Sequence, residues 1–329
     1  MVWIQFLISI VVIFYCGRKL SFYGDVISKK TGLGGGFIGV ILLGAVTSLP
    51  ELITTISSVS LIKEVNLAWG NILGSNLLNL TILSFCDIFI RKNTSIRVFD
   101  KGNVLTGSFS VIITLIALIA IATGKDLIFF HQISVYTVLI LTVYVTGSFL
   151  LYKTAVAEKA ENNVSPEESS FSNAKLFMIF AINASLIIVA GISVTYACED
   201  IAKITGLGAT FVGTLFLAIA TSLPEIVVSA SAIKIGAISM AGGNILGSNF
   251  FNISILGFSD IFYKAGTGSL YLDASKVNLF TGIMFIIVCN IIIAGMVLKS
   301  DKRFLKFGFD SILVMILYII TFYFIYEAI

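Results

Sequence analysis

The sequence predicts an all-α polytopic membrane protein with ten transmembrane helices, arranged as two inverted five-helix repeats. Three observations predict this fold: an apolar composition, a repeated pair of polar motifs and an uneven distribution of basic residues. Of the 329 residues, 57% are hydrophobic and only 12% are charged, and the mean hydropathy is +1.03. This much apolar surface exceeds what a water-soluble core of the same length can bury. We therefore expect the chain to lie in a lipid bilayer.

Ten apolar segments are long enough to cross a bilayer, which takes about 20 helical residues. The first follows Met1 without a basic region or a small-residue cleavage site, so we expect a retained span and not a signal peptide. The ten segments lie at residues 2–16, 33–60, 65–90, 103–122, 130–152, 175–197, 207–233, 237–262, 276–298 and 304–326.

A polar stretch separates the first five segments from the last five. Residues 153–174 are rich in Glu, Asn and Ser, a composition typical of a solvated linker. Their acidic residues lack the spacing of an EF-hand loop. The predicted organisation is therefore a first repeat at residues 1–152, a cytoplasmic linker at 153–174 and a second repeat at 175–329.

The two halves carry the same polar motifs. The sequence Thr-Ser-Leu-Pro-Glu at residues 47–51 returns at 221–225, and Gly-Asn-Ile-Leu-Gly-Ser-Asn at 70–76 returns at 243–249. The offsets are 174 (225 minus 51) and 173 (243 minus 70). Because the spacing within each half agrees to one residue, we interpret the chain as an internal duplication.

Basic residues predict the orientation of these repeats. Of the 21 Lys and Arg residues, 16 fall on one side of the predicted membrane, which the positive-inside rule makes cytoplasmic, with both termini outside. Five spans per repeat is an odd number, so the two copies must enter the membrane from opposite sides. Inverted repeats are typical of secondary transporters, whose sites lie near the midplane on interrupted helices. The other side holds only Lys63, Lys125, Lys203, Lys264 and Lys276.

Glu51 and Glu225 are the two acidic residues predicted deep within a span. A central acid costs about 2.5–3.5 kcal/mol on insertion scales, and such residues usually face a bundle interior and mark an ion pathway. No basic residue lies mid-span in either half, so a structural ion pair is not expected. Pro50 and Pro224 precede these acids directly and should break the helix there, which frees backbone carbonyls as ligands. A simple packing kink is the alternative reading of each proline.

Further oxygen donors accompany each glutamate. Glycines four residues apart in the second motif allow close helix packing, and Ser75 lies one helical turn before Asn79, as Ser248 does before Asn252. Oxygen ligands with two carboxylates suit hard cations, Ca²⁺ or Na⁺. Once Ca²⁺ leaves, the two acids repel each other unless other cations replace it, which is the physical basis of antiport.

The paired motifs resemble those of the cation/calcium exchanger superfamily, and the chain is most similar to its prokaryotic sodium/calcium exchanger branch. The resemblance implies ten helices, alternating access by sliding of helices 1 and 6, and one calcium with three sodium positions. It implies no cofactor and no obligate protein partner, but transported Ca²⁺ and Na⁺ in a prokaryotic cell membrane. By position, the expected ligands are Glu51, Glu225, Asn79, Asn252, Ser48, Ser75, Ser222 and Ser248, with the backbone of Gly44, Thr47, Ala218 and Thr221.

One position departs from the family pattern and leaves two couplings open. Many sodium/calcium exchangers carry an Asp where this chain has Asn252, so both central positions are amides. Two glutamates alone can exchange one Ca²⁺ for two H⁺, which makes a Ca²⁺/H⁺ antiporter the alternative.

Other classes of function fit less well. A cation channel is a remote alternative, because channels arrange their ligands as a ring around a pore. An enzyme is not expected, since His131 is the sole histidine and no H-E-x-x-H or G-x-S-x-G motif occurs. The four cysteines lie far apart without paired ligand spacing, which argues against a zinc site, and no nucleic-acid partner is expected.

Overall fold

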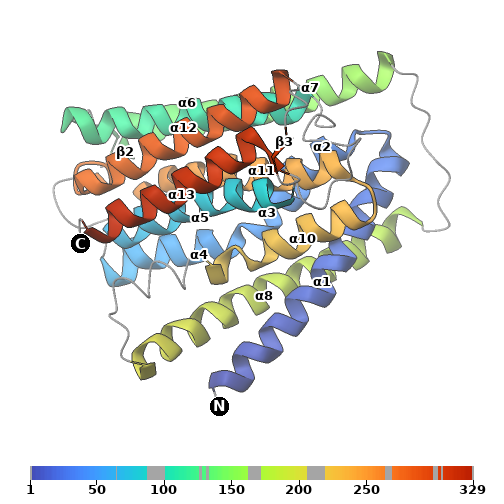
Figure 1. The fold of residues 1–329 in the computed structure, drawn as a ribbon, viewed down its shortest axis with the longest axis horizontal. Helices are drawn as coiled ribbons and strands as arrows, with labels where there is room; N and C mark the ends of the chain where they lie inside the picture. Colours follow the sequence, from blue (N-terminus) through green and yellow to red (C-terminus); the bar gives the residue numbers. More distant parts are fainter. Residues whose placement is uncertain are drawn as a thin grey trace.

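Long helices running side by side make up most of the molecule (Figure 1). In the described part of the chain, seven helices are long and apolar enough to cross a membrane. A further apolar helix, Phe309–Ile325, is shorter. A computed structural model describes residues 2–63, 65–86, 101–125, 128–130, 133–161, 172–205, 219–263, 269–298, 303–304 and 307–327.

Helices account for nearly all the described elements. The second apolar segment is interrupted and divides into α2 (Gly35–Ile38), the π-helical turn η1 (Gly39–Leu43), α3 (Gly44–Thr47), α4 (Leu49–Ser57) and the π-helical turn η2 (Ser58–Ile62). The remaining helices are α1 (Val2–Thr31), α5 (Val65–Cys86), α6 (Lys101–Thr123), α7 (Val135–Glu161), α8 (Asn173–Thr205), α10 (Leu223–Lys234), α11 (Ile238–Phe262), α12 (Lys276–Leu298) and α13 (Phe309–Glu327).

Several helices extend beyond the apolar stretch that predicts them. Helix α1 continues fifteen residues past the expected end at residue 16. An ion pair between Lys29 and Asp25, at 3.0 Å and one helical turn apart, stabilises this more polar second half. Helix α7 likewise runs into the expected linker and ends at Glu161. Hydropathy therefore predicts the apolar part of each helix but not the residues at which the helix begins and ends.

Two short antiparallel ladders also depart from the all-α prediction. Strands β1 (Ile128–Phe130) and β2 (Ile133–Ser134) join α6 to α7. Strands β3 (Arg303–Phe304) and β4 (Phe307–Gly308) join α12 to α13 in the same way. Each ladder pairs only a few residues, too short a run to give an alternating pattern in sequence.

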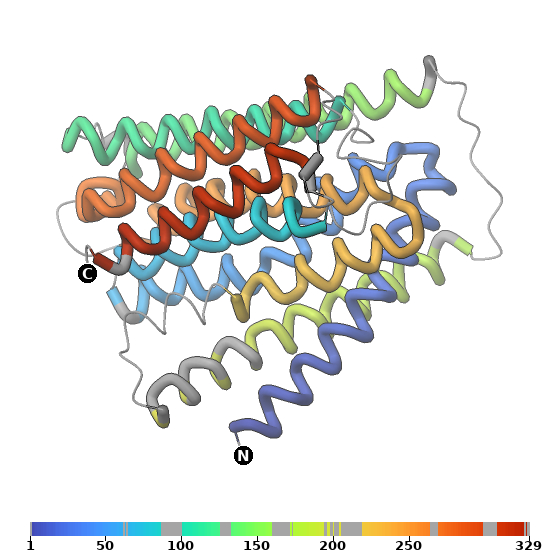
Figure 2. The backbone as a smooth tube through the Cα atoms, in the orientation of Figure 1, coloured from blue at the N-terminus to red at the C-terminus, as the bar shows by residue number. Residues whose placement is uncertain are grey.

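Helix α11 occupies the centre of the molecule. It packs against α5, α6, α7, α10 and the α2–α4 segment, and nearly all its residues are buried. Helices α1 and α8 pack against each other and form one flank of the molecule, as Figure 2 shows. Their buried residues join those of α10 in a single apolar cluster.

Two equivalent polar contacts at the helix ends join one half of the chain to the other. Asn278, at the start of α12, donates to Asn66 Oδ1 near the start of α5 at 2.9 Å. With the halves exchanged, Asn103 at the start of α6 donates to Ser239 Oγ at the start of α11 at 3.1 Å. Asn66 and Ser239 are themselves 173 positions apart (239 minus 66), so the duplicated sequence folds into duplicated contacts.

Asp260 is a third buried carboxylate, and its partners give it a structural role. It lies near the end of α11 and accepts hydrogen bonds from Thr137 Oγ1 at 2.6 Å and from the backbone N–H of Ser134 and Leu270. These bonds tie the start of α7 and the buried turn at Leu270 to α11. Its repeat counterpart, Asp87, lies outside the described residues.

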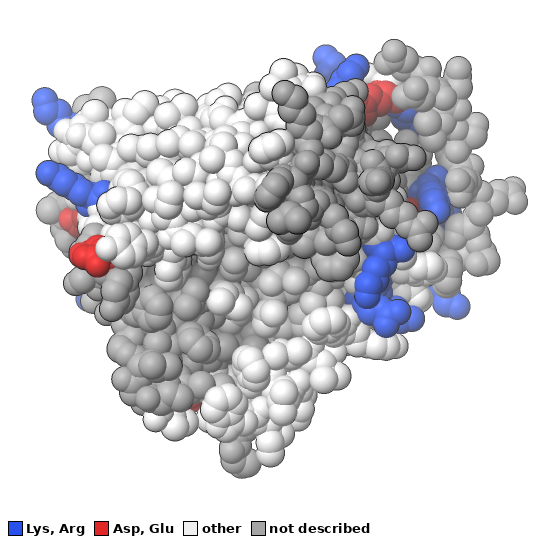
Figure 3. Space-filling view, viewed as in Figure 1, with Lys and Arg blue, Asp and Glu red and all other residues white. Residues whose placement is uncertain are grey.

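Charged side chains gather toward the two ends of the helix bundle on the face that Figure 3 presents. The described surface between them on that face is uncharged. Many large apolar side chains there and elsewhere are exposed, among them Trp3, Leu7 and Val11 of α1. This distribution fits a protein whose sides face lipid tails.

Candidate functional site

Both Thr-Ser-Leu-Pro-Glu motifs interrupt a helix at the same residue. The backbone leaves the helical conformation at Ser48 (φ −91°, ψ 8°) and at Ser222 (φ −84°, ψ 1°). A new helix then begins, with Pro50 and Pro224 in its first turn. Proline is well tolerated at that position because its missing N–H would have had no helical partner.

Glu51 and Glu225 lie in the first turn after each break, on α4 and α10. The free N–H groups at the start of a helix favour negative charge there. Both side chains are completely buried, so neither faces lipid. They are also close enough to interact electrostatically, as expected for two acids that share one site.

Residues from the first half contact the glutamate of the second half. Ser48 Oγ donates a hydrogen bond to Glu225 Oε1 at 3.1 Å. Ser248 Oγ lies 3.2 Å from the same oxygen, and it also lies 3.2 Å from Thr47 Oγ1 and from the Gly44 carbonyl. Residues at the helix break of the first half therefore contact Glu225, directly or through Ser248.

Glu51 has the matching neighbours from the second half, with a different hydrogen-bonding state. Ser75 Oγ and Thr221 Oγ1 lie 3.4 Å apart and both are near the Glu51 carboxylate. Neither carboxylate oxygen of Glu51 has a hydrogen-bond partner among the described residues. The two acids thus have equivalent surroundings, with two hydroxyl groups beside each, but only the hydroxyls at Glu225 meet the geometry of a hydrogen bond to the carboxylate.

Two asparagines that sequence reasoning missed hold α5 and α11 together. Asn76 Nδ2 donates to the Asn249 carbonyl at 3.3 Å, and Asn249 Nδ2 donates back to the Asn76 carbonyl at 3.2 Å. Their side-chain oxygens accept from Asn252 Nδ2 and Asn79 Nδ2, each at 3.0 Å. These bonds fix both central amides so that their oxygens are left over for other ligands. The signal was the last Asn of each repeated motif.

The residues assigned from the sequence therefore supply a set of buried oxygen atoms without a partner. Within the described ranges, no hydrogen bond reaches these atoms, although unpaired buried polar groups are uncommon and call for an explanation. A bound cation is one, because it is coordinated by the lone pairs of such oxygens. The unpartnered atoms are Glu51 Oε1 and Oε2, Glu225 Oε2, Ser222 Oγ, Asn79 Oδ1 and Asn252 Oδ1.

Glycines bring the backbones of the α2–α3 segment and α11 into contact. A Cβ on Gly44 would lie 2.8 Å from backbone atoms of Gly247 and Ser248. A Cβ on Gly247 would lie 2.5 Å from Val40 backbone atoms. The expected close approach at Gly243 and Gly247 is thus present, and it brings Ser248 within reach of the first break.

Eleven of the twelve predicted ligands lie in described segments. All eleven are buried. Contacts connect Ser48, Ser248, Thr47 and Gly44 to Glu225 and place Ser75 and Thr221 beside Glu51, whereas Asn79 and Asn252 bond the Asn76–Asn249 pair. Ala218 lies outside the described residues. In the described part of the chain, no three His, Cys, Asp or Glu residues are placed so that they could hold a metal ion together, so any cation here relies on two carboxylates and neutral oxygens.

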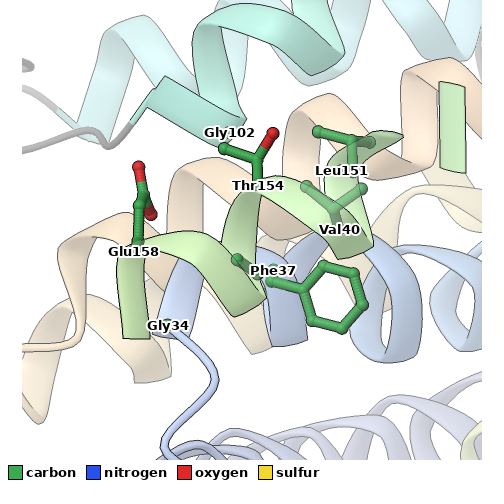
Figure 4. A pocket seen from close by; sticks show the side chains of 8 residues that line it. Gly34, Phe37, Val40, Gly102, Leu151, Thr154 and Glu158 are labelled. Atoms are coloured by element: carbon green, nitrogen blue, oxygen red, sulfur yellow. The ribbon is translucent and has the colours of Figure 1, made fainter. Parts of the chain in front are cut away.

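A surface hollow lies elsewhere, between α2, α6 and α7. Its lining includes Phe37, Val40, Leu151 and Glu158, and Figure 4 shows their arrangement. None of the predicted ligands lines it. The hollow is therefore separate from the paired glutamates.

Comparison with known proteins gives this site a context. The family model described as sodium/calcium exchanger protein matches residues 1–156 and 175–327. Inner membrane protein YrbG of Escherichia coli is 25% identical over 294 residues, covering 86% of this chain and 87% of YrbG. Sodium/calcium exchanger MaX1 of Methanosarcina acetivorans is 25% identical over 308 residues, covering 83% of this chain and 87% of MaX1.

A solved structure shares the fold. The sodium-calcium exchanger NCX_Mj, soaked with Na⁺ and Sr²⁺, superposes with a TM-score of 0.73 at 21% sequence identity, over 97% of this chain and 98% of that one. The family match extends over both motif pairs. The chain is therefore an integral membrane protein that belongs to the sodium/calcium exchanger family.

Proposed function

We propose that this protein exchanges Ca²⁺ for Na⁺ by alternating access at a site between Glu51 and Glu225. The observation that carries the proposal is a pair of completely buried carboxylates whose oxygens are largely without protein partners in the described residues. Two negative charges match one Ca²⁺. Calcium takes six to eight oxygen ligands, and the surrounding amides, hydroxyls and carbonyls offer enough.

Ten helices in two inverted repeats remain our interpretation of the fold. The reciprocal bonds between Asn76 and Asn249 and the equivalent breaks at Ser48 and Ser222 support it. In such an arrangement, one site at the repeat interface can be exposed to each side in turn. Both termini outside and the linker in the cytoplasm follow from the basic residues in the sequence.

Sodium coupling rests on the neutral oxygens beside the carboxylates. The hydroxyls of Ser48, Ser75 and Ser248 lie beside one or the other glutamate, and serine oxygens are suitable ligands for a hard monovalent ion. The relative MaX1 is named a sodium/calcium exchanger. The second candidate is Ca²⁺/H⁺ exchange, favoured by the amides at Asn79 and Asn252, which leave two carboxylates as the site's only acids among the described residues.

Uptake of ⁴⁵Ca²⁺ into proteoliposomes distinguishes these functions. We expect uptake under an outward Na⁺ gradient at constant pH and none under a pH gradient without Na⁺. The reverse result would establish proton exchange in place of sodium exchange. Uptake that is not saturable and needs no counter-ion would instead indicate a channel.

A further inference from the structure

One buried amide beside the site has no role among the predicted ligands. Asn71 lies four residues before Ser75 on α5, and Thr55 lies four residues after Glu51 on α4. Residues four apart share a helix face, so Thr55 lies one turn from Glu51 and Asn71 lies one turn from Ser75, which neighbours the Glu51 carboxylate. Both are displaced toward the connection between α4 and α5. Asn71 Nδ2 donates to Thr55 Oγ1 at 3.1 Å.

The oxygen of this amide is available for a ligand. Asn71 is 1% exposed and Thr55 is fully buried. With its nitrogen held by Thr55, Asn71 leaves Oδ1 without a hydrogen-bond partner in the described segments. Glu51, one turn away, has two more oxygens in the same condition. The unpartnered oxygens of the site thus continue from Glu51 toward one end of the molecule.

The second half contains the same pair with its oxygen already used. Asn244 Nδ2 donates to Ser229 Oγ at 2.9 Å, one turn from Glu225 toward the connection between α10 and α11. There, Asn244 Oδ1 accepts a hydrogen bond from Thr47 Oγ1 at 3.3 Å. The α4–α5 and α10–α11 connections lie at opposite ends of the bundle (Figure 1). On the α10–α11 side of the site, the side-chain oxygen of Asn244 is therefore occupied by a protein hydrogen bond. On the α4–α5 side, the side-chain oxygen of Asn71 has no such bond within the described residues.

We propose that Asn71 Oδ1 and Glu51 form an entry subsite that binds the transported hard cation at the end of the bundle where α4 meets α5. A buried, proton-free amide oxygen can replace one water of hydration as the ion approaches the paired carboxylates. The proposal rests on the proposed exchange function. It adds a residue that acts at one membrane face only.

The half-saturating Ca²⁺ concentration at each membrane face tests this subsite. It is measured separately for the two faces, in proteoliposomes in which the protein is active in one orientation. Because Asn71→Leu keeps the approximate size but removes the oxygen, it should raise that concentration roughly tenfold at the α4–α5 face. The other face should stay close to wild type. The matched control is Asn290→Leu, an exposed α12 residue whose Nδ2 donates to the Ile286 carbonyl of its own helix, and it should change neither face.

A second variant keeps the test decisive if Asn71→Leu does not fold. Asn71→Asp retains an oxygen and adds charge, so it should lower the half-saturating Ca²⁺ concentration at the α4–α5 face. Equal effects at both faces, or no effect of either variant, would overturn the subsite. Glu51→Gln is measured beside these variants. If Glu51→Gln loses exchange while the Asn71 variants behave like wild type, the proposed function stands and the subsite is wrong. If Glu51→Gln exchanges normally, both the proposed function and the subsite are wrong.

Discussion

At the scale of single residues, Glu51 and Glu225 explain why a charged group can remain in the membrane interior. Each lies at the start of a helix that begins after a proline-associated break, where the helix dipole favours a carboxylate. The dipole offsets only part of the cost of burying an ion, and two adjacent acids repel each other. In the proposed function, the transported cation supplies the remaining stabilisation.

Removing either charge should abolish calcium exchange. Glu51→Gln and Glu225→Gln keep the size of the side chain but each removes one attraction to the divalent ion. A single negative charge 4 Å from a divalent ion is worth about 8 kcal/mol at an effective dielectric constant of 20, and even half of that makes Ca²⁺ bind roughly a thousandfold more weakly. Sodium-driven ⁴⁵Ca²⁺ uptake measures the loss. Glu158→Gln, in the separate surface hollow, serves as control and should retain uptake.

Adding a charge at the central amide should change the pH dependence. Asn252→Asp replaces the group that donates to Asn76 Oδ1 at 3.0 Å with one that can donate only when protonated. We expect the half-saturating Ca²⁺ concentration to vary more steeply with pH than in wild type. Profiles of uptake against pH that coincide for the two proteins would contradict the central position of Asn252.

At the scale of elements, the close packing of α3 on α11 makes the site possible. The sequence predicted the helix breaks beside Pro50 and Pro224 and the close contact at the α11 glycines, because proline and glycine have strong local effects on the backbone. The π-helical turns η1 and η2 and the Asn76–Asn249 pair were not predicted, since they depend on how two helices meet. Asn71 stood in a recognised motif, but only its orientation in the structure distinguishes it from a packing residue.

Enlarging a glycine at this contact should destabilise the protein. In Gly44→Ala the new methyl group would lie 2.8 Å from backbone atoms of Gly247 and Ser248, so the helices must separate, at a cost of about 1–3 kcal/mol. Gly35→Ala is the matched control, because its Cβ would meet Met240 Cβ at an ordinary 3.5 Å. A lower melting temperature in detergent is expected for Gly44→Ala relative to Gly35→Ala, and equal values would contradict this packing.

At the scale of the whole molecule, composition and repetition predicted a membrane protein of exchanger type. Helix lengths were predicted less well: α1, α7 and α8 continue into charged sequence that hydropathy excludes. The small hairpins before α7 and α13 were also missed. Tertiary contacts determine these helix ends and hairpins, so the sequence alone does not predict them.

If three Na⁺ exchange for one Ca²⁺, as the three sodium positions implied by the family resemblance would allow, each cycle moves one net charge. A membrane potential of 100 mV contributes about 2.3 kcal/mol for each charge moved across it. Sodium-driven calcium uptake should therefore change rate when a potassium diffusion potential is imposed with valinomycin. A rate that does not respond would favour electroneutral exchange for protons.

Equilibrium binding of ⁴⁵Ca²⁺ to the purified protein tests most directly whether Glu51 and Glu225 hold one ion together. We expect one Ca²⁺ per chain, lost completely in Glu51→Gln and equally in Glu225→Gln, and displaced by Na⁺. Retained high-affinity binding in either variant would contradict a shared site.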